Sequence, residues 1–219
     1  MKLGKSSMSK LRIFHKLSPV HVLGPGIRAV IWVQGCPFQC PGCLVPESWS
    51  EDGGYEESSE SLAQWVMEQK GIDGLTLSGG EPMLQAKALA NLVDIVRDNA
   101  DMGVICYTGY NIEHIIHNGN QDQHALLSKL DMLIDGAYIR EKHADLLWRG
   151  SSNQRLIALT DRYKHIINET AGDSDQSAGL EFFLDESGHT SFAGVPSMPG
   201  FRTQFEGMMR ERGIDLKNQ

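Results

Sequence analysis

Residues 27–43 read IRAVIWVQGCPFQCPGC, so an apolar, β-branched stretch leads directly into three cysteines. Ile27 to Gln34 are predicted to form a β-strand, because β-branched and aromatic side chains favour extended backbone. The prolines and the glycine between the cysteines favour turns. The sequence therefore predicts a loop with three closely spaced cysteines at the carboxyl end of a strand.

On either side of this loop, strand and helix patterns alternate. Short apolar stretches predict strands, and apolar residues at helical spacing predict helices. Strands are predicted at residues 11–17, 27–34, 73–77, 103–107, 132–134 and 156–159. Helices are predicted at residues 61–70, 83–99, 111–117, 122–130 and 161–167, and residues 138–155 are predicted to be irregular. Such alternation is typical of an α/β fold with mainly parallel strands and crossover helices.

The C-terminal part of the chain has a different character. Residues 171–178 (AGDSDQSA) form a polar linker without core-forming side chains. After the linker, a β-hairpin and a final helix are predicted at residues 179–184, 189–193 and 201–212. The sequence Asp185-Glu186-Ser187-Gly188 is the expected hairpin turn. We therefore expect a core domain at residues 1–170 and an extension at residues 171–219 that packs on it.

The composition argues against several classes of protein. The 219 residues are 41% hydrophobic and 22% charged, which is typical of a globular chain. The net charge of −8, without a dense basic stretch, argues against a nucleic-acid partner. The sequence has no run of about 18 apolar residues and no apolar segment after its N-terminal lysines. We therefore expect no membrane partner, no secretory signal and a cytoplasmic location.

The cysteine spacing indicates a metal centre. Cys36, Cys40 and Cys43 form a C-x3-C-x2-C pattern, and clustered cysteines in a reducing compartment are more often metal ligands or catalytic groups than disulfides. Thiolates suit iron–sulfur clusters and zinc, but a structural zinc site needs a fourth ligand, and no second pair stands at ligand spacing. A cluster with one iron open to a cofactor is favoured, with zinc and chance clustering as alternatives. Cys106, inside a predicted strand, is interpreted as core.

Small or polar groups follow the other predicted strands. Gly79 and Gly80 come after one strand, Thr108 after the next and Asp135 after a third. The carboxyl ends of parallel strands share one edge of the sheet, where ligands bind in such folds. We therefore expect these groups to lie near the cysteines, although ordinary βα turns are the alternative interpretation for the glycines, the threonine and the aspartate.

The cysteine pattern, followed by Ser78-Gly79-Gly80-Glu81-Pro82 after the next strand, resembles the radical S-adenosylmethionine superfamily. The resemblance implies that Cys36, Cys40 and Cys43 bind a 4Fe–4S cluster and that S-adenosylmethionine chelates the fourth iron. It also implies that the Ser78 to Pro82 segment contacts the methionine amino group. The residue types suit this role, because glycines allow close backbone approach and a Glu81 carboxylate accepts hydrogen bonds from an ammonium.

A closer resemblance is to the glycyl-radical activating enzymes, especially the small activase of anaerobic ribonucleotide reductase. The matching segments are Cys40–Cys43, Ser78–Pro82, Tyr107–Tyr110, Ile134–Gly136 and Arg149–Arg155, in the same order as in the family. The resemblance places Gly42, Thr108 and Asp135 among the cofactor-binding residues. It also implies an open, partial β/α barrel, with the Arg149 to Arg155 segment near the cluster or the protein substrate.

The function implied by this family is reductive cleavage of S-adenosylmethionine to a 5′-deoxyadenosyl radical, which abstracts hydrogen from a glycine of a partner protein. A flavodoxin-type or ferredoxin-type protein would donate the electron. Two departures, Leu44-Val45-Pro46 after the third cysteine and the C-terminal extension, keep a peptide or small-molecule substrate as an alternative. A non-catalytic iron–sulfur or zinc protein is the alternative from another class.

Overall fold

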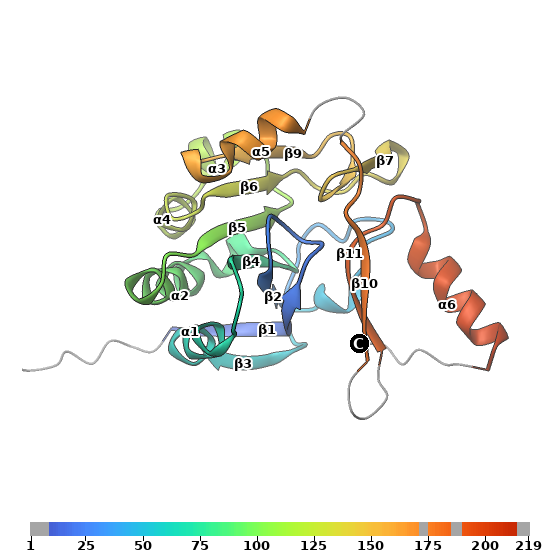
Figure 1. The fold of residues 1–219 in the computed structure, drawn as a ribbon, viewed down its shortest axis with the longest axis horizontal. Coiled ribbons are helices and arrows are strands. Elements are labelled where there is room, and N and C mark those ends of the chain that lie inside the picture. The colour runs from blue at the N-terminus through green and yellow to red at the C-terminus, as the bar shows by residue number, and fades with distance from the viewer. Residues whose placement is uncertain (1–8, 171–174, 185–189, 214–219) are drawn as a thin grey trace, which may run out of the picture.

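The computed structural model describes residues 9–170, 175–184 and 190–213. They form a mixed α/β structure in which helices cover one face of a large central sheet and a β-hairpin covers the other (Figure 1). The sheet has seven strands in the order β3-β1-β2-β4-β5-β6-β9. These strands are β1 (Lys10–Val20), β2 (Arg28–Val33), β3 (Tyr55–Ser58), β4 (Gly74–Gly79), β5 (Gly103–Thr108), β6 (Met132–Asp135) and β9 (Arg155–Ala158).

The four central strands are parallel, as the alternating pattern predicted. β2 pairs with β4, β4 with β5 and β5 with β6 in parallel, whereas β1, β3 and β9 add antiparallel edges. Val33 is paired with Gly79, and Thr108 is paired with Asp135. The loops that follow these strands therefore leave the sheet at the same edge, which brings the cysteine loop close to the loops after β4 and β5.

A large apolar core fills the space between the sheet and its helices. These helices are α1 (Ser59–Glu68), α2 (Ala86–Asn99), α3 (Ile112–Asn118) and α4 (Gln121–Leu127). Every residue of β2 is buried, which explains why the sequence after Arg28, Ala29 to Val33, is apolar without alternation. Ser58 caps α1 by accepting a hydrogen bond from the amide of Ser61 at 3.1 Å. Leu89 and Leu92 of α2 are fully buried in this core.

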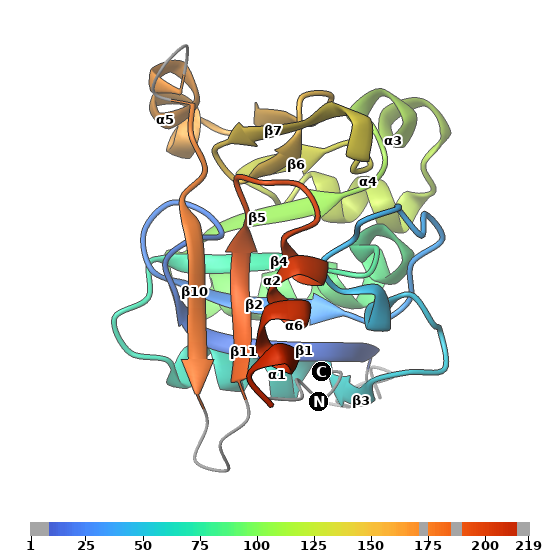
Figure 2. The same cartoon turned by 90° about the vertical axis from the view of Figure 1, so that its right-hand side faces the viewer.

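A hairpin of β10 (Gly179–Leu184) and β11 (Thr190–Val195) lies across the opposite face of the sheet (Figure 2). Ala193 is buried against Val30 and Trp32 of β2, with Phe183 and Val195 packed around them. α6 (Phe201–Glu211) follows the hairpin on the outer side. The predicted hairpin strands and final helix are thus present, while the predicted turn at Asp185 to Gly188 lies outside the described residues.

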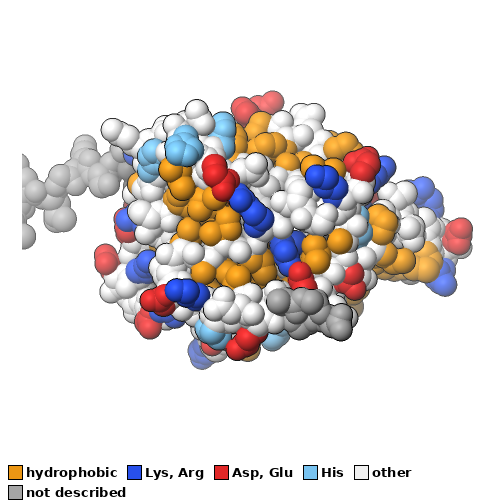
Figure 3. Space-filling model, turned by 90° about the horizontal axis from the view of Figure 1, so that it is seen from above, with side chains coloured by type: hydrophobic (Ala, Val, Ile, Leu, Met, Phe, Trp, Pro, Cys, Tyr) orange, Lys and Arg blue, Asp and Glu red, His pale blue; other side chains and the backbone are white. Residues whose placement is uncertain are grey.

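Among the described residues, the sheet ends at β9 without a further strand beside it. β9 pairs with β6 on one side only, and α5 (Lys164–Glu169) lies next to it. Leu156, Ile157 and Ile167 line a hollow of 610 Å³ at this edge. Seen from above, hydrophobic side chains gather across the middle of this surface, with charged side chains among them (Figure 3). In β9, Arg155 is therefore exposed, and Leu156, Ile157 and Ala158 are only half-buried.

Three segments differ from the sequence prediction. β3 was not predicted, because Tyr55–Ser58 is polar and pairs with β1 along its backbone. The predicted irregular segment 138–155 contains the short strands β7 (His143–Leu146) and β8 (Arg149–Ser151), which pair with each other. The helix predicted from residue 83 begins as a 3₁₀ turn at Pro82–Gln85, after which α2 continues.

No helix among the described residues combines the length and the apolar character needed to cross a membrane.

Candidate functional site

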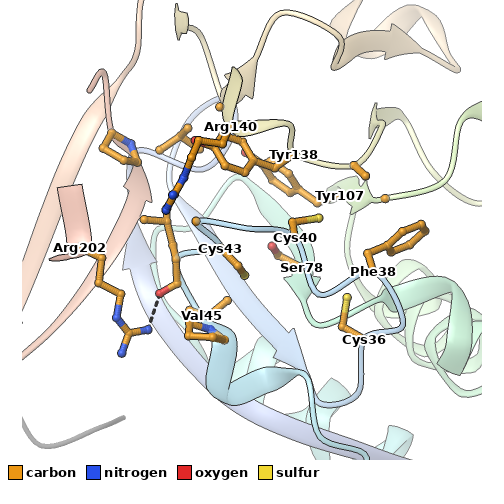
Figure 4. Close-up of a pocket in the computed structure, with 18 of the residues that line it drawn as sticks. Cys36, Phe38, Cys40, Cys43, Val45, Ser78, Tyr107, Tyr138, Arg140 and Arg202 are labelled. Carbon is orange, nitrogen blue, oxygen red and sulfur yellow. Dashed lines mark hydrogen bonds between the residues drawn. The ribbon is translucent and has the colours of Figure 1, made fainter. Parts of the chain in front are cut away.

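The three clustered cysteines lie in one cavity of 590 Å³ at the carboxyl edge of the parallel strands (Figure 4). The cavity also contains most of the residues that the sequence predicted to bind a cofactor. These lining residues are Gly42, Ser78, Gly79, Gly80, Glu81 and Thr108. Two predicted residues, Pro82 and Asp135, are not part of the lining. The fourth cysteine, Cys106, is fully buried in the main core, as expected.

Backbone hydrogen bonds anchor the cysteine loop at its base. The amide of Gly35 donates to the carbonyl of Ser48 at 2.8 Å, and the amide of Cys36 donates to the carbonyl of Trp49 at 3.0 Å. The Gln34 side chain donates to the carbonyls of Glu47 and Ser50 at 2.9 and 2.6 Å. The two ends of the loop are therefore held together, while the cysteines between them remain half-buried.

Gly42 needs its glycine because of both conformation and space. Its φ of 88° lies in the left-handed region, and a Cβ atom there would lie 3.2 Å from the Tyr138 ring and 3.3 Å from the Arg140 guanidinium. Without a side chain, the loop can turn between Cys40 and Cys43 so that both thiols face the cavity (Figure 4).

The chemistry of the three thiols fits a polynuclear metal centre. Burial raises the pKa of each thiol, and for Cys43 the hydrogen bonds with Val45 and Trp49 and the charge of Arg202 act in the opposite direction. Binding to a metal lowers the pKa of a thiol, because ligating thiols are deprotonated, and this opposes the effect of burial. Within the described ranges, no His, Cys, Asp or Glu group is placed to hold a single metal ion. Cubane ligands each bind a different iron, so thiols distributed around a loop fit a cluster better than a lone ion.

Gly79, the last residue of β4, and Gly80 bring that strand end into direct backbone contact with the cysteine loop. The amide of Gly80 donates to the carbonyl of Val33 at 2.7 Å, and the amide of Glu81 donates to the carbonyl of Gly35 at 2.7 Å. A Cβ atom on Gly79 would lie 2.4 Å from the amide nitrogen of Val33, and one on Gly80 would lie 2.2 Å from the carbonyl oxygen of Gly35. The glycines therefore fix the position of the cysteine loop as well as lining the cavity.

Glu81 connects the loop after β4 with the loop after β5. Its carboxylate is 1% exposed and accepts hydrogen bonds from the Thr108 hydroxyl and from the amides of Met83 and Gly109, each at 2.8 Å. Burial raises its pKa to about 7, although the three hydrogen bonds act in the opposite direction. Glu81 and Thr108 therefore have each other as partners, and the expected contact of Glu81 with an ammonium group stays a prediction.

Asp135 lies behind the cavity wall because its carboxylate is used to join β6, α3 and β9. The fully buried side chain accepts a hydrogen bond from the amide of Ile112 at 2.8 Å and from Nε of Arg155 at 2.9 Å. Arg155 also pairs with Glu113 at 2.7 Å. Gly136, the next residue, does line the cavity.

The predicted Arg149 to Arg155 segment acts mainly on backbone groups beside the cavity. Asn153 donates to the carbonyl of Ala137 at 2.8 Å, and the Gln154 amide donates to the carbonyl of Gly136 at 2.9 Å. Arg149 instead forms an ion pair of 2.5 Å with Asp175. This segment therefore holds the stretch after β6 in place.

Several aromatic and basic residues that were not predicted as site residues also line the cavity. They are Phe38, Tyr107, Tyr138, Arg140, His143 and Trp148. Tyr138 and His143 contact each other through the phenol oxygen and Nδ1 at 3.2 Å. Trp148 is 6% exposed, has a left-handed φ of 54°, and its indole nitrogen has no partner among the described residues. Phe38 lies in the predicted cysteine loop, and Tyr107 lies in β5, within the matched segment Tyr107–Tyr110. The other four lie in or next to the short β7–β8 hairpin, which no sequence pattern indicated.

The C-terminal extension supplies a further wall of the same cavity. The residues involved are Val195, Pro196, Met198, Gly200, Phe201, Arg202, Thr203 and Glu206. They face Leu44, Val45 and Pro46, which directly follow the third cysteine. The extension therefore meets the chain at the position where the sequence departs from the family pattern.

Comparisons with known proteins agree with this geometry. A family model described as a 4Fe-4S single cluster domain matches residues 22–157. The anaerobic ribonucleoside-triphosphate reductase-activating protein of Vibrio cholerae is 36% identical over 67% of this chain and 98% of its own length. The protein of that name from Enterobacteria phage T4 is 34% identical over 66% of this chain and 92% of its own length. The pyruvate formate-lyase-activating enzyme of Clostridium pasteurianum is 34% identical over 42% of each chain.

The residues matched by the family model include the cysteine loop, the two glycines at the end of β4 and the segments after β5 and β6. The resemblance inferred from the sequence is therefore confirmed. The chain belongs to the radical S-adenosylmethionine enzymes that activate glycyl-radical proteins, with a 4Fe–4S cluster and S-adenosylmethionine as its cofactors.

Proposed function

We propose that Cys36, Cys40 and Cys43 hold the 4Fe–4S cluster and leave its fourth iron to the amino and carboxyl groups of S-adenosylmethionine. One observation carries this proposal: these three thiols share a cavity with Gly79 and Gly80 at the end of β4, although the two segments are separated by more than 30 residues in the sequence. Cys106 is buried elsewhere and has no part in the cluster.

We assign the remaining predicted residues to two kinds of role. Gly42, Thr108 and the segment from Ser78 to Glu81 line the cavity and are placed to contact the cofactor. Pro82 and Asp135 act indirectly. Pro82 begins the 3₁₀ turn that leads into α2, and Asp135 holds the start of α3 and Arg155 behind the cavity wall.

When bound and reduced by a one-electron donor, the cluster and S-adenosylmethionine supply a 5′-deoxyadenosyl radical that abstracts a hydrogen atom. The chain surrounds this chemistry with Phe38, Tyr107, Tyr138 and Trp148, which limit the access of water to the cavity. The substrate that we propose is a backbone glycine of a partner protein, an anaerobic ribonucleoside-triphosphate reductase or a related enzyme. The names of the relatives support this choice.

The remaining assignments follow from the same proposal. We infer that a flavodoxin-type or ferredoxin-type protein donates the electron, and that the enzyme works in the cytoplasm, where exposed thiols stay reduced. We describe the sheet as an open, partial β/α barrel, which is supported by its four parallel strands and by the one-sided pairing of β9. The division into a core at 1–170 and an extension at 171–219 is supported by the separate two-stranded sheet of β10 and β11.

The experiment that tests the substrate is electron paramagnetic resonance under strictly anaerobic conditions. The reconstituted protein is mixed with S-adenosylmethionine, dithionite and an anaerobic ribonucleotide reductase from the same organism. We expect the doublet signal of a glycyl radical on the reductase, and no signal when the reductase carries alanine at its radical glycine. If the activase cleaves S-adenosylmethionine but no glycyl signal forms, the proposed substrate is wrong.

A further inference from the structure

Arg202 of α6 is connected to the segment that directly follows the third cysteine. Its guanidinium donates to the carbonyl of Leu44 at 2.7 Å and to Oε2 of Glu47 at 2.7 Å. Figure 4 shows Arg202 at the cavity, with a dashed line for a hydrogen bond of its guanidinium. A second nitrogen of the same guanidinium also pairs with Glu47, and Nε donates to Glu206 at 2.6 Å. These contacts place a cation of the C-terminal extension on the cysteine loop.

The rest of α6 is only loosely packed. No residue of this helix is buried, and within the described part of the chain its aromatic contacts with the hairpin are those of Phe205 with Phe182 and of Phe201 with Phe192, at ring-centroid separations of 5.3 and 5.8 Å. Arg202, by contrast, has a side chain that is only 20% exposed. The ion pair with Glu47 is thus the main polar contact of α6 with the core, and it lies at the cavity.

The ion pair of Arg202 with Glu47 lies where it can influence the reduction of a cluster, because reduction changes the charge of the cluster. Adding an electron to a cluster makes it more negative, and a nearby cation stabilises the reduced state while a nearby carboxylate opposes it. Arg202 and Cys43 line the same cavity, and Arg202 binds the residue next to Cys43. Arg202 also lies outside residues 22–157, the segment matched by the family model.

We propose that Arg202 is a positioning residue for the cluster, which fixes the Leu44 to Glu47 segment and raises the reduction potential through its charge. The proposal rests on the proposed function, because it assumes that Cys43 is a cluster ligand. The C-terminal extension would therefore act directly on the reduction potential of the cluster. Glu47, as the opposing charge, has the opposite electrostatic effect.

Four variants separate the effect of charge from the effect of loop order. Arg202→Gln removes the cation, and Arg202→Lys keeps the charge but not the paired hydrogen bonds. Glu47→Gln removes the opposing carboxylate. Arg210→Gln is the matched control, because it removes one positive charge from the last turn of the same helix, where Arg210 has no described contact with residues 44–47.

The measurement is the midpoint potential of the reconstituted holoenzyme, obtained by redox titration monitored with electron paramagnetic resonance. We expect Arg202→Gln to shift the potential to more negative values and Glu47→Gln to shift it to less negative values. Arg202→Lys and Arg210→Gln should stay close to the unaltered protein. Opposite signs at Arg202 and Glu47 indicate a charge effect, because disorder of the loop would shift both variants in the same direction.

The proposal is overturned if Arg202→Gln has the same potential as Arg210→Gln, or if Glu47→Gln shifts in the same direction as Arg202→Gln. If Arg202→Gln fails to fold or to retain its cluster, the sign of the Glu47→Gln shift decides the question. Failure of the proposed function looks different, because the unaltered protein would then not take up a cluster at these cysteines at all.

Discussion

Replacing Gly80 with alanine is expected to disrupt the cysteine loop through a backbone clash. The new Cβ atom would lie 2.2 Å from the carbonyl oxygen of Gly35, whereas real Cβ atoms essentially never approach closer than 3.0 Å. The strand end or the loop must therefore move by about 0.8 Å, and overpacking of this kind costs about 1–3 kcal/mol. Weakening the hydrogen bonds from Gly80 to Val33 and from Glu81 to Gly35 adds about 1 kcal/mol. We expect a total loss of about 2–4 kcal/mol.

The same displacement should reduce activity, because a misplacement of about 1 Å at a reacting centre costs about 100-fold in rate. Urea denaturation of the metal-free protein measures the stability, and formation of 5′-deoxyadenosine measures the activity. Gly207→Ala is the matched control, since nothing lies within 4 Å of its added methyl group and alanine favours the helix. The reasoning is refuted if Gly80→Ala unfolds at the same urea concentration as the unaltered protein and retains full activity.

Three further predictions concern buried groups around the cavity. Burial raises the pKa of Glu81 from 4.5 to about 7, so the free energy of unfolding should fall by about 3 kcal/mol as the pH rises from 4.5 to about 7. Urea titrations at several pH values measure this change, and Glu81→Gln should lose it. Arg155→Met leaves the buried Asp135 carboxylate without its cation and should cost about 2 kcal/mol in urea denaturation, whereas Lys164→Met, which removes an exposed cation, should cost almost nothing. Cys106→Ala should lower the melting temperature but leave the iron and sulfide content unchanged, because Cys106 is core; a fall in iron content would refute this assignment.

The alternating α/β order and the position of the cysteine loop could be predicted from the sequence. Both depend on local patterns: the apolar run Ala29 to Val33 in β2 indicates a central strand, and the helical spacing of leucines in α2 indicates a face packed on the sheet. β3 could not be predicted, because Tyr55–Ser58 has no apolar pattern. This strand is held at the edge by backbone pairing with β1 and by ion pairs such as Lys10 with Glu56 at 2.8 Å.

The individual roles at the site depend on contacts between distant segments, which no local pattern contains. The expected contact of Glu81 with a ligand ammonium stays a prediction, and its carboxylate accepts hydrogen bonds from Thr108 at the end of β5, 27 residues later, and from the amide of Gly109. Asp135 was expected in the pocket, and Arg155 and the start of α3 hold it behind the wall. The contact of Arg202 with Glu47 joins residues 155 positions apart, so only the folded chain reveals that the extension reaches the cysteine loop.

We propose that Cys36, Cys40 and Cys43 together hold the cluster that cleaves S-adenosylmethionine. The most direct measurement is the yield of 5′-deoxyadenosine after anaerobic reconstitution with iron and sulfide, followed by S-adenosylmethionine and dithionite. We predict product from the unaltered protein and from Cys106→Ala, and none when any one of the three clustered cysteines is replaced by alanine. A fully loaded cluster that yields no 5′-deoxyadenosine, or a cysteine-loop variant that still yields it, would contradict the claim.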